Sequence, residues 1–191
     1  MTQSIVAIST CCDGQGYTVD GLYINRPNTD KIGLFGYVNS TIKNIGVTNL
    51  DIQGDKFVGG LVGHTLDSSY ITNSYSSGNV SGDAEVGGLV GYHRDSNITK
   101  SYSTGSVNGG ESVGGLVGAN FGGSYITNSY SSGSVSGDRA VGGLLGKNYE
   151  GTVVDSFWNT ETSTTIPQLS LARIYIITKN VVSRQATINS L

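Results

Sequence analysis

The strongest constraint on the fold is an internal repeat of 27 or 28 residues. Its most regular element is the string Gly-Gly-Leu-Val-Gly, found at 59–63, 87–91 and 114–118, with variants at 33–36 and 142–146. Successive central leucines are therefore 27, 28, 27 and 28 residues apart. A period of this length, kept over five copies, is typical of an array of stacked structural units. These leucines are Leu34, Leu61, Leu89, Leu116 and Leu144.

Two further blocks follow each leucine at a nearly fixed distance. An Ile-Thr-Asn-Ser-Tyr block begins at Ile71 and Ile126, and Ile98 begins the variant Ile-Thr-Lys-Ser-Tyr. A shorter Gly-x-Val-x-Gly block is centred on Val80, and on equivalent valines in later repeats. Three short apolar segments separated by Gly, Ser and Asn predict three strands per repeat. We therefore expect an all-β fold, a right-handed parallel β-helix (β-solenoid) with about 27 or 28 residues per coil.

In such a solenoid each coil pairs with the next about 4.8 Å away, so equivalent residues form columns along the rod. Columns that are apolar in every copy are expected to point inward, and the leucines form one of them. The glycines beside each leucine are expected to have a positive φ or to lie where no Cβ fits. The second inward column is Ile42, Ile71, Ile98, Ile126 and Val153. A third is Ile32, Val58, Val86, Val113 and Val141.

Composition excludes several other classes of protein. Glycine supplies 29 of 191 residues and charged residues only 13%, which disfavours a helical protein. The net charge of -3 argues against a nucleic-acid partner, because no summed positive field is available. No apolar run approaches the length of a membrane span, so we expect no membrane insertion. The fivefold register of leucine and isoleucine argues against disorder, the rival interpretation of a chain rich in Gly and Ser.

Nothing in the sequence predicts catalysis or a cofactor. It contains no P-loop, GxSxG or HExxH motif, so we expect no enzyme and no bound cofactor. Asp55, Asp83 and Asp138 follow glycines in what we interpret as tight turns; calcium-binding solenoids instead repeat Gly-Gly-x-Gly-x-Asp every nine residues. His64 and His93 follow successive GLVG strings, and we interpret them as exposed turn residues rather than metal ligands.

The GLVG strings, the NSYS blocks and the closing segment 156–162 together resemble the GLUG-repeat segments of large microbial surface proteins. These include filamentous-haemagglutinin-like adhesins and IgA-peptidase-associated regions. The resemblance covers about Asp13 to Thr162. It implies a secreted or cell-surface solenoid module with a structural or adhesive role and no catalytic site. It also implies an extracellular or cell-surface location.

Three regions follow from these patterns. Residues 1–12 are expected to be a lead-in, and residues 13–162 a solenoid of about five GLxG coils after a partial first coil. Residues 163–191 contain no glycine and no acidic residue, so they form either a cap or a tail foreign to the solenoid. Uncovered sheet edges recruit other chains, so end-to-end or edge self-association is possible in the absence of a cap.

Two outward columns are candidate binding surfaces. Tyr75, Tyr102 and Tyr130, followed by Phe157, form an aromatic column. It is either a structural ladder or, if its rings are exposed, a ribbon for glycans or for host and cell-surface proteins. Hydroxyl-bearing columns on a flat solenoid face also suit ice binding, which is one alternative function; a self-assembling fibre subunit is another. The hydroxyl-bearing column is Thr72, Thr99 and Thr127.

Overall fold

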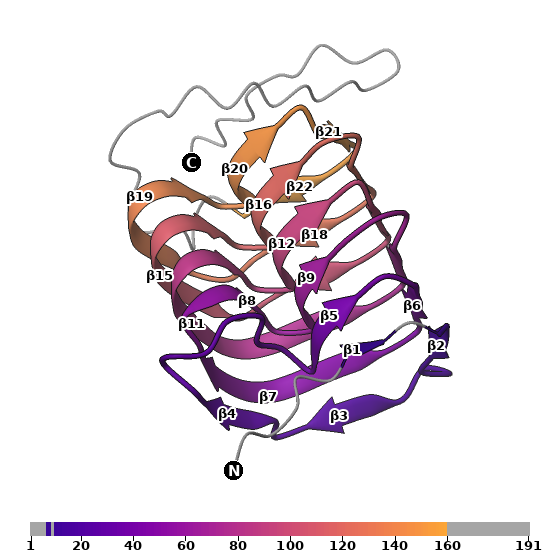
Figure 1. The fold of residues 1–191 in the computed structure, drawn as a ribbon, viewed down its shortest axis with the longest axis horizontal. Helices are drawn as coiled ribbons and strands as arrows, with labels where there is room; N and C mark the ends of the chain where they lie inside the picture. Colours follow the sequence, from indigo (N-terminus) through magenta and orange to yellow (C-terminus); the bar gives the residue numbers. More distant parts are fainter. Residues whose placement is uncertain (1–6, 9, 160–191) are drawn as a thin grey trace, which may run out of the picture.

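The computed structural model describes residues 7–8 and 10–159, and the regular elements within these ranges are all β-strands. The strands stack in coils along one axis, from β3 and β4 at one end to β20 and β21 at the other (Figure 1). Within the described residues the strands of neighbouring coils pair in parallel, as β10 does with β13. The predicted β-solenoid is therefore confirmed. In the described part no helix is long and apolar enough to cross a membrane.

Three parallel sheets run along the rod. The first sheet contains β1 (Ala7–Ile8), β5 (Phe35–Val38), β9 (Val62–Thr65), β12 (Val90–Arg94), β16 (Val117–Phe121) and β20 (Leu145–Tyr149). The second sheet contains β2 (Cys12–Asp13), β6 (Thr41–Lys43), β10 (Tyr70–Thr72), β13 (Asn97–Thr99), β17 (Tyr125–Thr127) and β21 (Thr152–Val154). The third sheet contains β3 (Thr18–Asp20), β4 (Tyr23–Asn25), β7 (Gly46–Gln53), β8 (Lys56–Gly59), β11 (Tyr75–Gly87), β14 (Tyr102–Ser103), β15 (Ser106–Gly114), β18 (Tyr130–Ser131), β19 (Val135–Gly142) and β22 (Phe157–Trp158).

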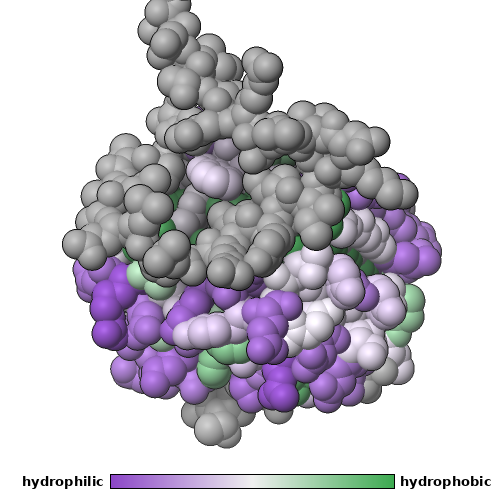
Figure 2. Space-filling view, turned by 90° about the horizontal axis from the view of Figure 1, so that it is seen from above, coloured by the Kyte–Doolittle hydropathy of each residue, from purple (hydrophilic) through white to green (hydrophobic). Residues whose placement is uncertain are grey.

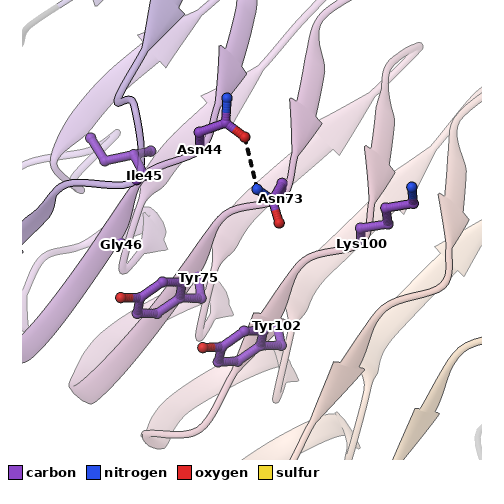
Figure 3. A pocket seen from close by; sticks show the side chains of 8 residues that line it. Asn44, Ile45, Gly46, Asn73, Tyr75, Lys100 and Tyr102 are labelled. Carbon is purple, nitrogen blue, oxygen red and sulfur yellow. Dashed lines mark hydrogen bonds between the residues drawn. The ribbon is translucent and has the colours of Figure 1, made fainter.

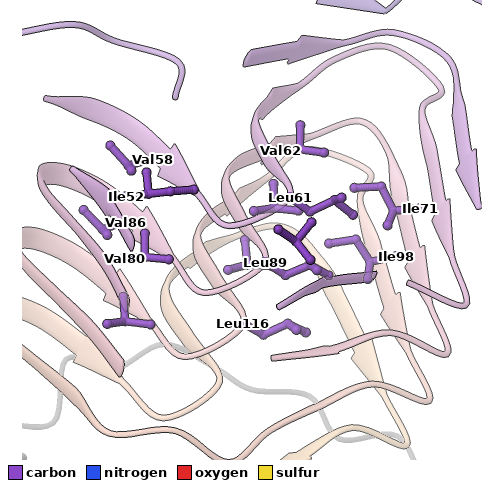
Figure 4. Packing of buried hydrophobic residues seen from close by; sticks show 14 of the residues in the cluster. Ile52, Val58, Leu61, Val62, Ile71, Val80, Val86, Leu89, Ile98 and Leu116 are labelled. Carbon is purple, nitrogen blue, oxygen red and sulfur yellow. The ribbon is translucent and has the colours of Figure 1, made fainter. Parts of the chain in front are cut away.

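The third sheet curls back on itself at one side of the coil, as β11, β15 and β19 show (Figure 1). Glu85 lies in this bend with φ of 50°, and the equivalent residue of the next coil, Ser112, has φ of 56°. The curl encloses a small group of valines and isoleucines that includes Val80 and Val86. Figure 4 shows this group beside a larger one containing Leu89 and Ile98. The single hydrophobic core therefore has a main part and a narrower extension inside the curl.

The leucine and isoleucine columns form the main core. Leu61, Leu89 and Leu116 are fully buried, and Leu144 is 2% exposed. Of the isoleucine column every member from Ile42 to Val153 is at most 1% exposed. Leu34 differs from the expectation, because it is only half-buried and packs against the edge of the core. It belongs to the first GLxG coil, and the partial coil before it covers it incompletely within the described residues.

The glycines of the GLVG string are required by close backbone approach rather than by a positive φ. None of them is among the described residues with positive φ. A Cβ on Gly91 would lie 2.5 Å from the carbonyl carbon of Phe57 and from the nitrogen of Val58. A Cβ on Gly88 would collide with the hydroxyl of Ser103 and with a carbonyl oxygen of the next coil. Of the two expected reasons for these glycines, only the second holds.

The Ile-Thr-Asn-Ser-Tyr block is not one strand but the corner between two sheets. Ile71 lies in β10 and Tyr75 begins β11, whereas Asn73 between them has φ of 51° and turns the chain. The block was expected to form a single strand, and that expectation is wrong. A left-handed residue every 27 to 29 residues makes this corner in each coil. These residues are Asn44, Asn73, Lys100, Asn128 and Asp155.

Buried serines hold the corner together. The Oγ of Ser101 accepts a hydrogen bond from the nitrogen of Ser74 in one neighbouring coil, and the nitrogen of Ser101 donates to Ser129 Oγ in the other. The Ser101 hydroxyl itself donates to the carbonyl of Thr99. After the tyrosine, the Ser76 hydroxyl donates to the carbonyl oxygen of Gly88, 2.7 Å away. The NSYS and GLVG parts of the repeat therefore contact each other across the coil.

Candidate functional site

The aromatic column forms a continuous ladder on the outside of the third sheet. Tyr75 and Tyr102 stack with ring centroids 4.9 Å apart and planes within 2° of parallel. Tyr130 continues the ladder at 4.9 Å, and Phe157 closes it at 5.3 Å. Because each ring covers the face of its neighbour, the three tyrosines present edges and hydroxyl groups to solvent rather than ring faces. Burial, with the nearby Tyr130 and Tyr75 hydroxyl groups, raises the pKa of Tyr102.

The ladder ends where Gly46 occupies the next position of the column. The Tyr75 ring lies against this glycine, since a Cβ there would collide with the ring, and its hydroxyl is 2.9 Å from Thr18 Oγ1. A groove of about 200 Å³ opens beside it. Figure 3 shows Asn44, Asn73 and Lys100 along one side of this groove, and the Tyr75 and Tyr102 rings along the other. We call this the corner groove.

The polar side of the corner groove begins as a chain of hydrogen bonds. Asn73 Nδ2 donates to Asn44 Oδ1 at 2.7 Å, and Asn44 Nδ2 donates to Asp13 Oδ1 at 3.0 Å. The amide of Asn44, the backbone of Gln15 and the ammonium group of Lys43 lower the pKa of Asp13 to about 2. Lys43 Nζ lies 3.1 Å from the same carboxylate. The negative charge at this end of the groove is therefore already paired.

The threonine column lies on the neighbouring face, on the outside of the second sheet. Thr72, Thr99 and Thr127 are directly in register, and Thr127 Oγ1 donates to Thr99 Oγ1 at 3.0 Å. All three are half-buried. The other outward position of these short strands holds tyrosine or asparagine, such as Tyr70, which is 48% exposed. The hydroxyl face is therefore a single column wide.

The two histidines are not exposed turn residues, and that interpretation is wrong. They lie in β9 and β12 and point to opposite sides of the first sheet, because Thr65, not His64, is the partner of His93. His93 is fully buried in the core, whereas His64 is half-buried outside it. Two side chains on opposite sides of a sheet cannot share a metal ion. No group of three or more potential ligands occurs among the described His, Cys, Asp and Glu residues.

His64 belongs to an aromatic cluster that the repeat pattern did not reveal. Its ring stacks on Phe57 at 5.3 Å and meets Tyr92 edge-on at 4.8 Å. Tyr92 stacks in turn on Phe121, whose ring stacks on Tyr149. Burial lowers the pKa of His64 to about 4, with help from nearby cations, so the ring is neutral at pH 7. The cluster joins two columns, Tyr37, His64 and Tyr92 in one and Phe121 and Tyr149 in the other, and the sequence analysis did not single out either of them.

His93 is part of a polar column inside the core. Its Nδ1 lies 2.8 Å from Thr65 Oγ1. Asn120 and Asn148 occupy the equivalent positions in the next coils, and Asn120 Nδ2 donates to Asn148 Oδ1 at 2.8 Å. Burial lowers the pKa of His93 from 6.5 to about 3. The folded protein therefore holds a neutral imidazole where two other coils hold an amide.

Replacing His93 with asparagine should reduce the acid sensitivity of the fold. Below pH 6.5 the unfolded chain protonates this histidine, while the folded chain stays neutral until about pH 3. The unfolded state then binds more protons, so lowering the pH costs about 1.4 kcal/mol of stability per pH unit. Urea denaturation at pH 6.5 and 4.5 should show a smaller loss of stability for His93→Asn than for the native chain. Equal losses would contradict the buried neutral imidazole.

The described part of one face of the molecule is mostly polar. On the face shown in Figure 2, the described residues are largely hydrophilic or intermediate, and hydrophobic residues are visible only in small patches. At the curl of the third sheet, Arg139 and Glu111 form an exposed ion pair at 2.6 Å beside Asp83 and Lys56. Pairs this exposed contribute little to stability. The hollow at the curl is lined mainly by charged residues, whereas the corner groove combines aromatic ring edges, amide groups and a cation.

The comparisons with known proteins agree with the repeat geometry. The family model described as the GLUG motif matches three consecutive segments, residues 58–81, 82–108 and 109–136. No curated protein and no solved structure shows significant similarity to the chain. The outer coils continue the same columns on both sides of the matched segments, as the pairings of Ile71 with Ile42 and of Ile126 with Val153 show. The resemblance to GLUG repeats is thereby confirmed over residues 58–136: the chain carries three consecutive GLUG motifs within a β-solenoid of about five coils.

Proposed function

We propose that this solenoid is a non-enzymatic adhesive module of a secreted or cell-surface protein, whose coils present outward columns for weak multivalent contacts. The stack of coils that carries the GLUG motifs supports the structural part of this function. The observation that supports the adhesive part is the corner groove, where the tyrosine ladder runs beside Asn44, Asn73 and Lys100. Weak contacts repeated on one rigid body, or on several chains of one surface, add up to useful affinity. Glycans and cell-surface proteins are the partners that this surface suits, and an extracellular location goes with them.

Ring edges and amides favour polar partners over apolar ones. Amide groups both donate and accept hydrogen bonds, and tyrosine hydroxyl groups do the same. Sugar hydroxyl groups offer the matching donors and acceptors. Because the faces of the tyrosine rings are mostly covered, we expect contacts along the edges of the ladder rather than stacking of sugar rings on it.

A glycan array probed with the chain in monomeric and in bead-displayed form tests the adhesive role. We expect binding by the displayed form, and a loss of binding in Asn73→Ala, which removes one polar side of the groove. Asn108→Ala is a matched control, because Asn108 is exposed elsewhere on the third sheet. Binding that is absent in every format, or equally strong in both variants, would contradict the proposed role of the groove.

The threonine column supports ice binding as the alternative function. Thr72, Thr99 and Thr127 repeat at the strand spacing, which is a regular array of hydroxyl groups. The column is only one residue wide, and the Thr127 hydroxyl group already donates a hydrogen bond to the Thr99 hydroxyl group. An ice recrystallisation assay on the native chain and on Thr99→Val decides between the two functions. Inhibition by the native chain that Thr99→Val weakens would replace the adhesive proposal.

A further inference from the structure

Lys100 is the exception among the five left-handed corner residues Asn44, Asn73, Lys100, Asn128 and Asp155, which we call the corner column. All five members of this column are left-handed, with φ between 47° and 55°, and the other four are asparagine or aspartate. Asparagine and aspartate tolerate this backbone conformation, whereas other residues with a Cβ are disfavoured in it. An ammonium group cannot accept a hydrogen bond, so Asn128 cannot donate to Lys100 as Asn73 donates to Asn44, and the amide chain does not continue past this coil. Lysine therefore weakens the corner where asparagine would fit it.

No polar contact among the described residues offsets this cost. The Lys100 side chain is exposed, and no ion pair or side-chain hydrogen bond joins its ammonium group to another described residue. The nearest corner carboxylate beyond Asn128 is Asp155, two coils away, and Asp13 is already held by Lys43 and Asn44. The unpaired cation lies on the wall of the corner groove.

We infer that the corner groove binds a carboxylated saccharide unit, with the Lys100 ammonium group on its carboxylate and Asn73 and Tyr102 on its hydroxyl groups. This inference rests on the proposed adhesive function and names the class of ligand. A lysine recognises a carboxylate as a compact point charge with three donors. Asn73 Oδ1 and the Tyr102 hydroxyl have no hydrogen-bond partner among the described residues, so both are available to a ligand.

The size of the groove fits one unit of an extended chain. Its volume of about 200 Å³ is below the roughly 300 to 1,000 Å³ of enclosed sites that hold a whole small molecule. A polyanion such as nucleic acid needs several cations along its path, and the net charge of -3 opposes it. A single cation among amides and hydroxyl groups suits a sugar that carries one carboxylate and several hydroxyl groups.

The test uses the full chain displayed on a sensor surface, with oligogalacturonate and hyaluronan fragments as acidic probes. Methyl-esterified oligogalacturonate is the matched neutral probe, and polyglutamate represents an acidic peptide. We expect the acidic saccharides to bind the native chain about fivefold more tightly than Lys100→Asn, and this difference to shrink in high salt. Lys56→Asn removes the same charge at the curl of the third sheet and should bind like the native chain.

A thermal melt separates the binding effect from damage to the fold. Lys100→Asn restores the residue that the corner favours, so its melting temperature should equal or exceed that of the native chain. Equal binding of oligogalacturonate and its methyl ester, or unchanged binding by Lys100→Asn, overturns the inference and leaves the adhesive function standing. Polyglutamate binding that depends on Lys100, without saccharide binding, assigns an acidic peptide instead. An absence of binding to every glycan and to polyglutamate overturns both proposals.

Discussion

Leu89→Asp should abolish cooperative unfolding of the solenoid. The Leu89 side chain is fully buried between coils, and nothing apolar around it can pair with a carboxylate. The substitution loses the burial of a leucine and places an unpaired charge in the core, at a cost of at least about 5 kcal/mol. That is comparable with the total stability of many single domains, about 5 to 15 kcal/mol. A thermal melt followed by far-ultraviolet circular dichroism should show no sigmoidal transition.

Thr99→Asp is the matched control for this prediction. Thr99 lies one strand residue after Ile98, on the opposite side of the second sheet, and its hydroxyl group only accepts a bond from Thr127 and faces outward. The change should cost about 1 kcal/mol or less and leave the transition cooperative. Similar damage from the two aspartates would contradict the assignment of inward and outward columns.

Gly91→Ala should have the second-largest effect. The added methyl group would lie 2.5 Å from two backbone atoms of the preceding coil, which cannot move without disturbing the pairing of that coil. Overpacking of this kind costs about 3 kcal/mol, which corresponds to a fall in melting temperature of about 6 to 12 °C. The measurement is again a thermal melt.

Gly123→Ala provides the comparison within the same chain. The nearest atom to its added methyl group is Asp95 Oδ1, at 3.9 Å, and Gly123 has no positive φ. Its melting temperature should stay within about 2 °C of the native value, because a glycine in open space tolerates alanine. If Gly91→Ala melted at the same temperature as Gly123→Ala, close backbone approach would not explain the GLVG glycines.

The columns of the fold could be predicted because one residue type recurs at one position. Leucine repeats every 27 or 28 residues and isoleucine every 27 to 29, and a stack of parallel coils is the arrangement that buries both columns at once. The corners could not be located in the same way. In the sequence, Asn73 and its equivalents look like ordinary polar residues of a strand. Their left-handed backbone instead divides the Ile-Thr-Asn-Ser-Tyr block between two sheets.

The candidate sites were harder to predict than the core. The tyrosine column could be identified from its period, but whether ring faces or edges meet solvent depends on the stacking distance of 4.9 Å. His93 and His64 differ by one position in the strand, and this single residue decides between the core and the surface. The corner groove arises where Gly46 ends the ladder, so it depends on an exception to the repeat.

The pairing of successive coils is the central claim, and disulfide cross-linking measures it most directly. In a chain with Cys11→Ser and Cys12→Ala, the pair Thr72→Cys and Thr99→Cys would occupy directly opposed positions of β10 and β13. Parallel neighbours lie about 4.8 Å apart, within the range that a disulfide bridges, whereas Thr72→Cys and Thr127→Cys would be separated by two such steps. The account predicts that mild oxidation closes the first pair and leaves the second open. Closure of the second pair in the monomer, or failure of the first in a folded chain, would contradict the register of the solenoid.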